Sequence, residues 1–151
     1  MDARLRQRII EVLDANRIMT IATLRPDGWP QATTVGYVND GMVVWFLCGH
    51  DSQKAANLAR DDRVSLAING DPSDIMAITG VSMAAHAIAV ADRAEAQKVL
   101  RLMPTKYPGQ KALPVAMPTP EEVSLFRIEP RVISLLDYSR GFGHADLVTC
   151  P

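Results

Sequence analysis

The sequence predicts a mainly β fold, an antiparallel barrel of about six strands with three peripheral helices. Strand-like segments follow one another with short turns between them and do not alternate with helices, which argues against a doubly wound parallel sheet. The turns carry the Pro, Asn, Asp and Gly residues that reverse a chain. A closed barrel also leaves no unpaired strand edge. The 151 residues fit a single domain, residues 1–151, with its own core.

Composition and charge narrow the function classes. The chain is 48% hydrophobic and 22% charged with a net charge of −1, so nothing in it indicates a nucleic-acid or membrane-surface partner. Cys48 and Cys150 form no C-x-x-C pair, which argues against a disulfide scaffold and a thiolate metal site. The first residues lack the apolar stretch of a signal peptide, and no run reaches transmembrane length. We therefore expect a cytoplasmic protein.

The first half of the chain is predicted as a helix and a three-stranded antiparallel meander. The helix covers residues 2–15, because apolar residues such as Leu5 and Ile9 fall on one face. An alternating pattern rich in β-branched residues follows it and predicts three strands, at residues 17–24, 31–38 and 42–48. Strong turn signals separate them, Pro26-Asp27-Gly28 and Asn39-Asp40-Gly41.

The second half is predicted to complete the barrel. Its helices are residues 51–60 and 92–103, and Asp92 caps the second of these. Its strands are residues 64–68, 123–128 and 131–137, together with residues 75–90, which form one bent strand or two consecutive ones. Five prolines predict a loop over residues 104–120, and the tail from residue 138 to 151 is expected to be irregular.

The segment Gly49 to Leu58, between a strand and a helix, is the most informative for function. Ser52 is placed to cap the helix, whose first N–H groups and dipole favour an anion. Ser52 adds a hydroxyl, Gln53 an amide and Lys54 a positive charge, which together make a phosphate cradle. The alternative is that Asp51 or Ser52 only caps the helix and that Lys54 is a solvated surface charge.

Two strands offer further candidate residues. On the hairpin strand, Gln31, Thr33 and Thr34 offer donors and acceptors to a ring with polar edges, and Ala32 lets a flat ligand approach the backbone. An ordinary half-buried strand is the alternative. Trp45 and Phe46 are adjacent on the next strand, so one of them is expected in the core. Cys48 is interpreted as a small buried hydrophobic residue.

The tail and the histidines complete the candidates. A tail loop that contains Tyr138, Arg140, Phe142 and His144 can close over a ligand. Gly141-x-Gly143 lacks the third glycine and the context of a dinucleotide fingerprint. The three histidines, at positions 50, 86 and 144, have no metal-ligand spacing, so no metal site is expected. We find no supported Ser-His-Asp or paired-carboxylate arrangement, and the catalytic residues stay unknown.

These features occur in an order typical of one family. After the leading helix come Ile21-Ala22-Thr23-Leu24-Arg25-Pro26-Asp27-Gly28-Trp29-Pro30, the Asp40-Gly41 turn and the aromatic strand. Then follow Asp51-Ser52-Gln53-Lys54-Ala55-Ala56-Asn57-Leu58 and Asp61-Asp62-Arg63-Val64-Ser65-Leu66. Over about residues 5–92 the chain resembles the pyridoxamine 5′-phosphate oxidase-like, FMN-binding split-barrel family, and its tail, from Tyr138 to Val148, resembles one bacterial branch of it.

The resemblance implies a homodimer of split barrels with two flavin mononucleotide (FMN) sites at the subunit interface. It implies that Ser52, Gln53 and Lys54 hold the FMN phosphate. It further implies that Gln31, Ala32, Thr33 and Thr34 follow the isoalloxazine edge, and that Phe46, Leu47 and Cys48 line the ribityl side. Arg140, Phe142 and His144 are expected to reach the flavin from the partner chain.

The resemblance also implies an oxidoreductase that moves hydride or electrons between FMN and an unidentified small molecule. The true oxidases carry basic residues on the second strand and a close Arg-x-His near the C-terminus. Here that strand has no Arg or Lys, and Arg140 and His144 stand four apart, so pyridoxamine phosphate is not the expected substrate. The alternatives are a deazaflavin-dependent reductase and a non-catalytic flavin- or haem-binding protein, with His50, His86 or His144 as the axial ligand.

Overall fold

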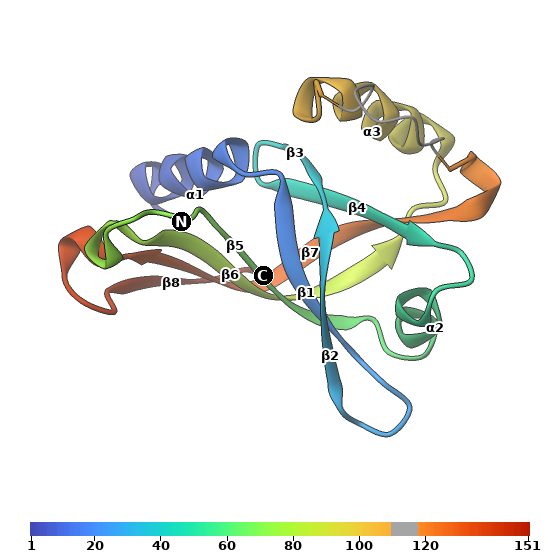
Figure 1. Ribbon diagram of the computed structural model, residues 1–151, viewed down its shortest axis with the longest axis horizontal. Coiled ribbons are helices and arrows are strands. Elements are labelled where there is room, and N and C mark those ends of the chain that lie inside the picture. Colours follow the sequence, from blue (N-terminus) through green and yellow to red (C-terminus); the bar gives the residue numbers. More distant parts are fainter. Residues whose placement is uncertain (110–117) are drawn as a thin grey trace.

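The computed structural model describes residues 1–109 and 118–151. One antiparallel sheet of eight strands curls into a half-barrel, and three α-helices surround it within the described residues (Figure 1). The helices are α1 (Ala3–Ala15), α2 (Gln53–Arg60) and α3 (Arg93–Lys106). The strands are β1 (Ile18–Leu24), β2 (Pro30–Gly36), β3 (Val38–Asp40), β4 (Val43–Gly49), β5 (Arg63–Asn69), β6 (Thr79–Ala89), β7 (Val123–Asp137) and β8 (Ala145–Thr149).

The pairing order confirms the antiparallel barrel class but corrects the meander. The strands pair in the order β2-β1-β5-β6-β7-β4-β3, and β8 adds to β7. β1 and β2 form the expected hairpin, and Gly28 has a φ of 86° in its turn. β4 pairs with β3 and β7 and not with β2, so residues 17–48 are not a three-stranded meander. The eight strands exceed the expected number of about six, because residues 31–38 divide and the tail forms a strand, while residues 123–137 form one strand where two were expected.

The division of residues 31–38 lies at Tyr37. β2 pairs with β1 as far as Gly36, and from Val38 the chain pairs with β4 at the other end of the sheet order. The Tyr37 side chain is 1% exposed, and its hydroxyl donates to the carbonyl oxygens of Leu13 and Asn16, at 2.7 and 2.9 Å. These hydrogen bonds hold Tyr37 at the point where the chain stops pairing with β1 and starts pairing with β4. The chain thereby connects the two ends of the sheet order.

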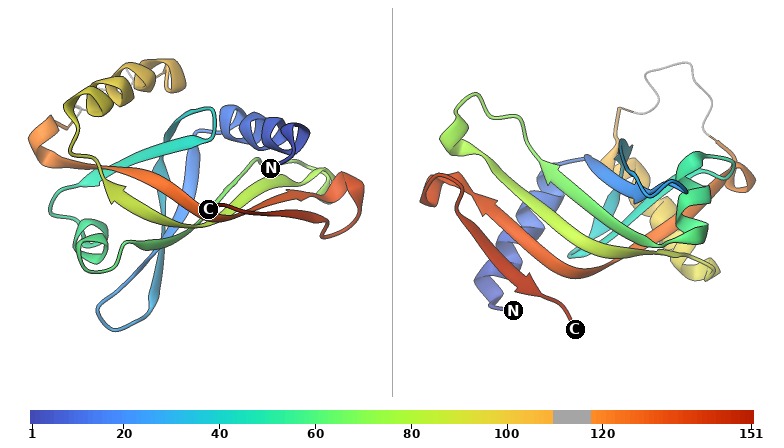
Figure 2. Two further views of the ribbon diagram at one scale, coloured as in Figure 1. Left: turned by 180° about the vertical axis from the view of Figure 1, so that it is seen from behind. Right: turned by 90° about the horizontal axis from the view of Figure 1, so that it is seen from below.

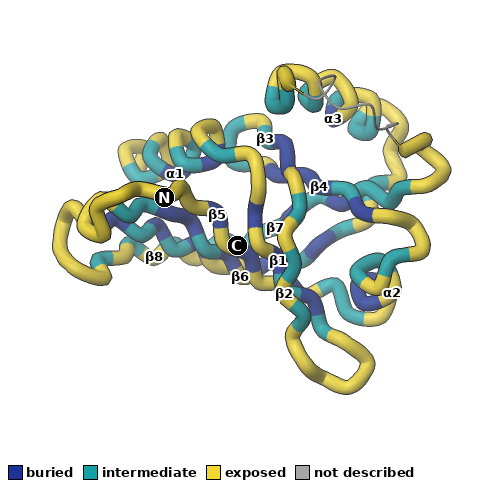
Figure 3. Tube along the Cα trace, viewed as in Figure 1, coloured by how far each residue is buried: buried dark blue, intermediate teal, exposed yellow. Residues whose placement is uncertain are grey.

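The core fills the inside of the half-barrel. The alternating side chains of the strands produce this core. In β5, exposed and buried residues alternate strictly along the sequence RVSLAIN. From α1, Ile9 and Leu13 are fully buried against the sheet (Figure 3). Each such side chain contributes about 1.5–3 kcal/mol by leaving water. α2 covers one end of the half-barrel, while the β7–β8 connection lies at the opposite end (Figure 2).

In the second half, one strand prediction is confirmed in part and one is wrong. Residues 75–90 contain one strand, β6, and not two, with a register shift at Ala84/Ala85, but a short 3₁₀ helix, Ile75–Ala77, precedes it. β7 is one continuous strand of 15 residues, so the predicted break at Glu129-Pro130 is wrong. Pro130 sits opposite that register shift, where the ladder is already irregular and a missing N–H costs little.

The third helix and the tail also differ from the prediction. α3 begins after the Asp92 cap but continues past Pro104 to Lys106, so the loop does not begin at residue 104. Lys106 Nζ donates to Leu13 O and Asn39 Oδ1, at 2.6 and 2.8 Å, which holds the last turn in place. The predicted loop also includes residues 110–117, outside the described residues. The tail is not irregular, because β8 pairs with β7.

The structure confirms that one of the two adjacent aromatic residues of β4 lies in the main core, and this residue is Phe46. Trp45 is buried as well, in a second cluster with Val38 and Val99 beneath α3. The Trp45 indole donates to Glu95 Oε1 at 2.7 Å, which explains how a polar indole is accommodated there. In the described part of the chain, no helix is long and apolar enough to cross a membrane.

Candidate functional site

The N-terminus of α2 has the geometry that the sequence predicts. Ser52 has an extended backbone, and its Oγ accepts a hydrogen bond from the N–H of Ala55 at 3.1 Å. The Ser52 N–H donates to Gly49 O at 3.0 Å, which closes the turn between β4 and the helix. The cap therefore uses one donor of the first turn, while the dipole concentrates positive potential there.

Lys54 is a half-buried cation in that first turn. Burial lowers the pKa of Lys54, and the nearby Cys48 at the end of β4 opposes this effect. Its ammonium group forms no ion pair or hydrogen bond with another described residue. Two other cations of this region are engaged, since Arg25 pairs with Asp27 and Arg60 donates to Leu24 O. Of these three cations, Lys54 is therefore the one whose charged group can bind an anion without first breaking a contact within the described residues.

A buried amide joins α2 to the neighbouring strands. Asn57 is fully buried, and its Nδ2 donates to Thr23 Oγ1 at 3.0 Å and to Gln31 Oε1 at 3.2 Å. Its Oδ1 accepts from Gln53 Nε2 at 2.8 Å. Two of the predicted site residues, Gln31 and Gln53, therefore both contact the Asn57 side chain.

The side chains of β2 alternate between its two faces. Gln31 and Thr33 are half-buried, whereas Ala32 and Thr34 are exposed on the other face. Thr33 Oγ1 is buried and has no hydrogen-bond partner among the described residues. A buried hydroxyl without a partner is costly, and a ligand atom can satisfy it.

The three candidates on β4 lie in different environments. Phe46 is 2% exposed and stacks on Phe126 with ring centroids 5.3 Å apart, so its side chain belongs to the core. Cys48 is also buried, as the sequence indicates. Leu47 is half-buried between these two. Phe46 therefore contributes packing behind this surface and presents no side-chain atoms on it.

An open groove of about 730 Å³ runs along the other side of α2, between the helix and the strands β6 and β7. Its walls are largely apolar, with Ala55, Leu58, Ile88 and Phe126 among them. His50 stands at this groove, and its Nδ1 lies 3.0 Å from Ser124 Oγ. The two other histidines have carboxylate partners, Asp62 for His86 and Asp146 for His144.

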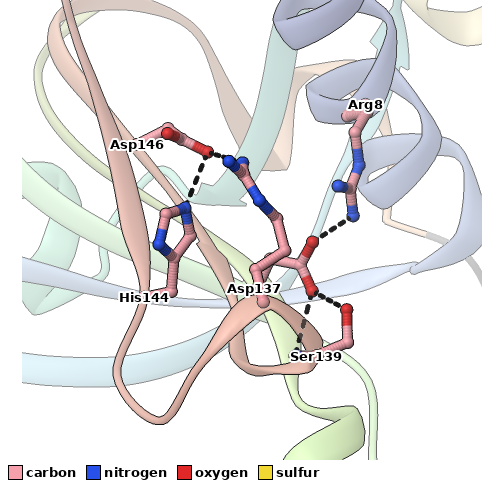
Figure 4. Close-up of polar contacts among 6 residues, drawn as sticks. Arg8, Asp137, Ser139, His144 and Asp146 are labelled. Atoms are coloured by element: carbon pink, nitrogen blue, oxygen red, sulfur yellow. Dashed lines mark hydrogen bonds and ion pairs between the residues drawn. The ribbon is translucent and has the colours of Figure 1, made fainter.

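The tail candidates form a separate polar cluster (Figure 4). The carboxylate of Asp146 lies 2.7 Å from Arg140 Nη1 and 3.3 Å from His144 Nε2. Phe142 is 76% exposed. In one chain, this cluster lies at the opposite end of the half-barrel from α2 (Figures 1 and 2). A single chain therefore does not bring Arg140, Phe142 and His144 to Ser52 and Lys54.

Next to that cluster, a buried carboxylate ties the tail to α1. Asp137 is 1% exposed, and its Oδ1 accepts from the Ser139 hydroxyl at 2.6 Å and the Ser139 N–H at 3.2 Å. Arg8 Nη2 on α1 lies 2.7 Å from Asp137 Oδ2 and forms an ion pair with it (Figure 4). Ser139, Arg8 and the backbone lower the pKa of Asp137, against the opposing effect of burial.

The sequence predicts no role for two residues of the α2 site, Asn57 and Thr23. One signal for Asn57 is present in the sequence. Gln53 and Asn57 are four residues apart, so they lie on one helical face next to the apolar Leu58. The partnership with Thr23 depends on the pairing of β1 with β2 and the docking of α2, which no local pattern reveals.

Comparisons with known proteins agree with this fold. The family model for pyridoxamine 5′-phosphate oxidase matches residues 5–137. A conserved hypothetical protein of Mycobacterium tuberculosis has 26% sequence identity and a TM-score of 0.75, over 93% of this chain and 87% of that one. No curated protein matches the sequence.

Two proteins of similar structure are named for haem. A haem-binding protein of Mycobacterium smegmatis has a TM-score of 0.74 and 22% identity, over 99% of this chain and 58% of that protein. A haem storage protein of Vibrio cholerae has a TM-score of 0.63 and 21% identity, over 82% of this chain and 88% of that one. At these identities, the likeness shows a shared fold.

Proposed function

The chain belongs to the pyridoxamine 5′-phosphate oxidase family, and on that basis we propose that it binds FMN and acts as an oxidoreductase on a small molecule. The observation that carries the proposal is the half-buried Lys54 in the first turn of α2, without a partner among the described residues. A phosphate group satisfies both this cation and the open N–H groups of the helix.

Most of the predicted residues have a role in this proposal, whereas Phe46 only packs behind the site. Lys54, Ser52 and Gln53 hold the phosphate from the N-terminal turn. Gln31 and the Thr33 hydroxyl, which has no partner among the described residues, hold the polar edge of the ring, whereas Ala32 and Thr34 lie on the other face of β2 and have no side-chain role in this arrangement. Leu47 and Cys48 line the middle of the ligand. FMN supplies the hydride or electron transfer, and the protein supplies binding and orientation.

We also propose that the working form is a homodimer. Arg140, Phe142 and His144 lie far from α2 in one chain, so a second copy is needed for them to reach a flavin at Lys54. Phe142 and Leu147 of this tail are 76% and 73% exposed, which gives it apolar surface for such a contact. The cofactor site is incomplete without the partner in this arrangement.

A specific feature of His50 favours haem binding as a second candidate. Its Nδ1 is engaged by Ser124, which orients the ring and leaves Nε2 available as an axial ligand. The adjoining groove of about 730 Å³ is lined mostly by apolar residues, with Asp51 and Asp62 among its polar ones. The two haem proteins of similar fold support this alternative.

Absorption titrations of the purified chain with FMN and with haemin separate these functions. FMN uptake, followed by loss of the blue flavin band on addition of NADH or NADPH, supports the oxidoreductase. FMN uptake without reduction by any donor indicates a flavin carrier. The leading proposal is contradicted, and haem binding supported, if the protein does not bind FMN but shows a Soret band with haemin that the variant His50→Ala loses.

A further inference from the structure

Two rows of uncharged side chains cross the outside of the curled sheet. Both rows run through six strands in register, in the order β2-β1-β5-β6-β7-β8. The first row is Thr34, Thr20, Ala67, Ser82, Ser134 and Leu147. The second row lies two residues further along each strand and consists of three alanines with Ser65, Val132 and Thr149. These twelve residues, none of which is buried, form the outer face.

The outer face lacks the charges that a sheet surface in water usually carries. Charged residues make up 22% of the chain, and such residues belong mostly on exposed surfaces. On β5, charge returns only at Arg63, beyond the end of the second row. The face also exposes apolar side chains, since Leu147 is 73% exposed and Ile18, on the same side of β1 as Thr20, is 58% exposed. Depletion of charge together with exposed apolar area is typical of the core of a protein interface.

The chemistry of the outer face suits a second copy of the same chain. In a dimer with two-fold symmetry, residues near the axis contact their own copies, so a charge there would face a like charge. A hydroxyl both donates and accepts, so a serine or threonine can form a hydrogen bond with its own copy. Alanines facing alanines leave room for two sheets to pack closely. A different protein would need complementary charge for specific recognition, and this face offers none.

We propose that two copies of the chain pack their outer faces together, about a two-fold axis that lies between the sheets and across the long axis of the molecule. The β7–β8 connection and α2 lie at opposite ends of that long axis (Figure 1). An axis in this direction reverses the second copy, so that its tail, with Phe142, meets α2 of the first. An axis along the molecule would place tail beside tail. The direction of the axis rests on the proposed function, because the proposed cofactor site needs the tail of the second copy.

The size of the outer face agrees with this arrangement. With strands about 4.8 Å apart and a rise of about 3.4 Å per residue, two rows across six strands cover roughly 400 Å². A standard protein interface buries about 800 Å² on each partner. The outer face therefore supplies about half of what a stable dimer needs, and the contacts between each tail and α2 supply the rest.

Ala67→Arg tests the outer face directly, in the absence of any flavin. Ala67 is exposed near the middle of the first row, so the folded chain accommodates the longer side chain, but a dimer must bury two like charges. Its dimer dissociation constant, measured by sedimentation velocity, should rise by about 100-fold or more. Ala94→Arg is the matched control, because Ala94 is exposed on α3, and it should stay dimeric. A monomeric unmodified chain, or equal constants for the two variants, overturns the inference.

A second measurement uses the unmodified chain and so does not depend on how a variant folds. A soluble paramagnetic compound broadens NMR signals of methyl groups that solvent reaches. In the dimer, the methyl signals of Ala67 and Ala84 should be protected, although both residues are exposed in one chain. The Ala94 methyl signal should broaden. Equal broadening of all three signals overturns the inference.

A titration with FMN tests the direction of the axis. Ala67 has no role in the proposed flavin contacts, so Ala67→Arg should weaken FMN binding only by separating the two copies, by about tenfold or more. Monomeric Ala67→Arg with unchanged FMN affinity overturns the placement of the tail at α2 of the other copy. A dimer that Ala67→Arg dissociates but that binds no FMN contradicts the proposed function and supports the outer face as the interface.

Discussion

Asn57 Nδ2 on α2 donates to Gln31 Oε1 on β2 across 3.2 Å, from a residue that no solvent reaches. This bond joins the helix that carries Ser52 and Lys54 to the strand that carries Thr33. The phosphate-binding and ring-binding parts of the proposed site are therefore held in one rigid unit, which lowers the cost of ordering them on binding.

Lys54→Ala should weaken FMN binding by about 10- to 100-fold, because it removes the charge-assisted contact with the phosphate and β2 offers no replacement cation. Riboflavin affinity should stay unchanged, since that ligand has no phosphate. Fluorescence titrations with the two flavins give both constants. Lys54→Arg is the matched control and should keep most of the FMN affinity. An equal loss for both flavins would place Lys54 away from the phosphate.

Ser52 has two roles that a pair of variants separates. Ser52→Ala should lower the free energy of unfolding by about 1 kcal/mol, because the N–H of Ala55 loses its cap. Ser52→Asp keeps a capping oxygen and should keep the stability, but its negative charge should abolish FMN binding at Lys54. Urea unfolding measures the first effect and flavin titration the second. FMN affinity retained in Ser52→Asp would contradict a phosphate site in this turn.

The Arg8–Asp137 pair makes stability depend on pH in the acid range. The pKa of Asp137 lies below its ordinary value of 3.8, so the folded chain holds this proton less tightly than the unfolded chain does. The stabilisation is complete above about pH 4 and is lost as the pH falls through the lowered pKa. Arg8→Ala should raise that pKa and lower stability at pH 7 by about 1–3 kcal/mol.

Acid titrations followed by circular dichroism check this prediction. Arg8→Ala should unfold at a higher pH than the unmodified chain, and the difference in stability should narrow below the pKa of Asp137. Arg4→Ala is the control, because Arg4 lies one turn earlier on α1 and its side chain has no ion pair among the described residues. Identical acid transitions in both variants would show that the Arg8 contact contributes nothing.

Gly36 marks a close approach between β2 and the end of α3. A methyl group added there would lie 2.7 Å from the Tyr107 hydroxyl oxygen, which accepts from the Tyr37 N–H. Gly36→Ala should therefore cost about 1–3 kcal/mol. Tyr107→Phe alone should cost about 1–2 kcal/mol through the lost hydrogen bonds. The double variant removes the clashing oxygen, so its loss should be smaller than the sum. Additive losses by urea unfolding would contradict this contact.

The sequence predicts a helix cap or a turn correctly where a single residue determines it. The Ser52 and Asp92 caps and the Gly28 turn all occur as expected, because each depends on side-chain or backbone chemistry within a few residues. The wrong predictions concern features that depend on contacts between distant parts of the chain. Nothing local shows that Tyr37 divides one strand into two, or that Pro130 lies at a register shift inside a continuous strand.

The candidate site likewise has one part that the sequence predicts and another that only the fold reveals. The Ser52, Gln53 and Lys54 turn follows from its place before a helix, so the sequence could predict it. Asn57 could not be assigned a role, because its partners Thr23 and Gln31 come from two strands that meet only in the fold. The tail residues Arg140, Phe142 and His144 need a second chain to join this site, and one sequence cannot place them.

A fluorescence titration of the unmodified apoprotein with FMN and with riboflavin under the same conditions tests the proposed phosphate site most directly. FMN should bind at least about tenfold more tightly than riboflavin, because its phosphate meets Lys54 and the N-terminus of α2. Equal affinities would contradict the phosphate site, and absence of binding to either flavin would contradict the flavin assignment itself.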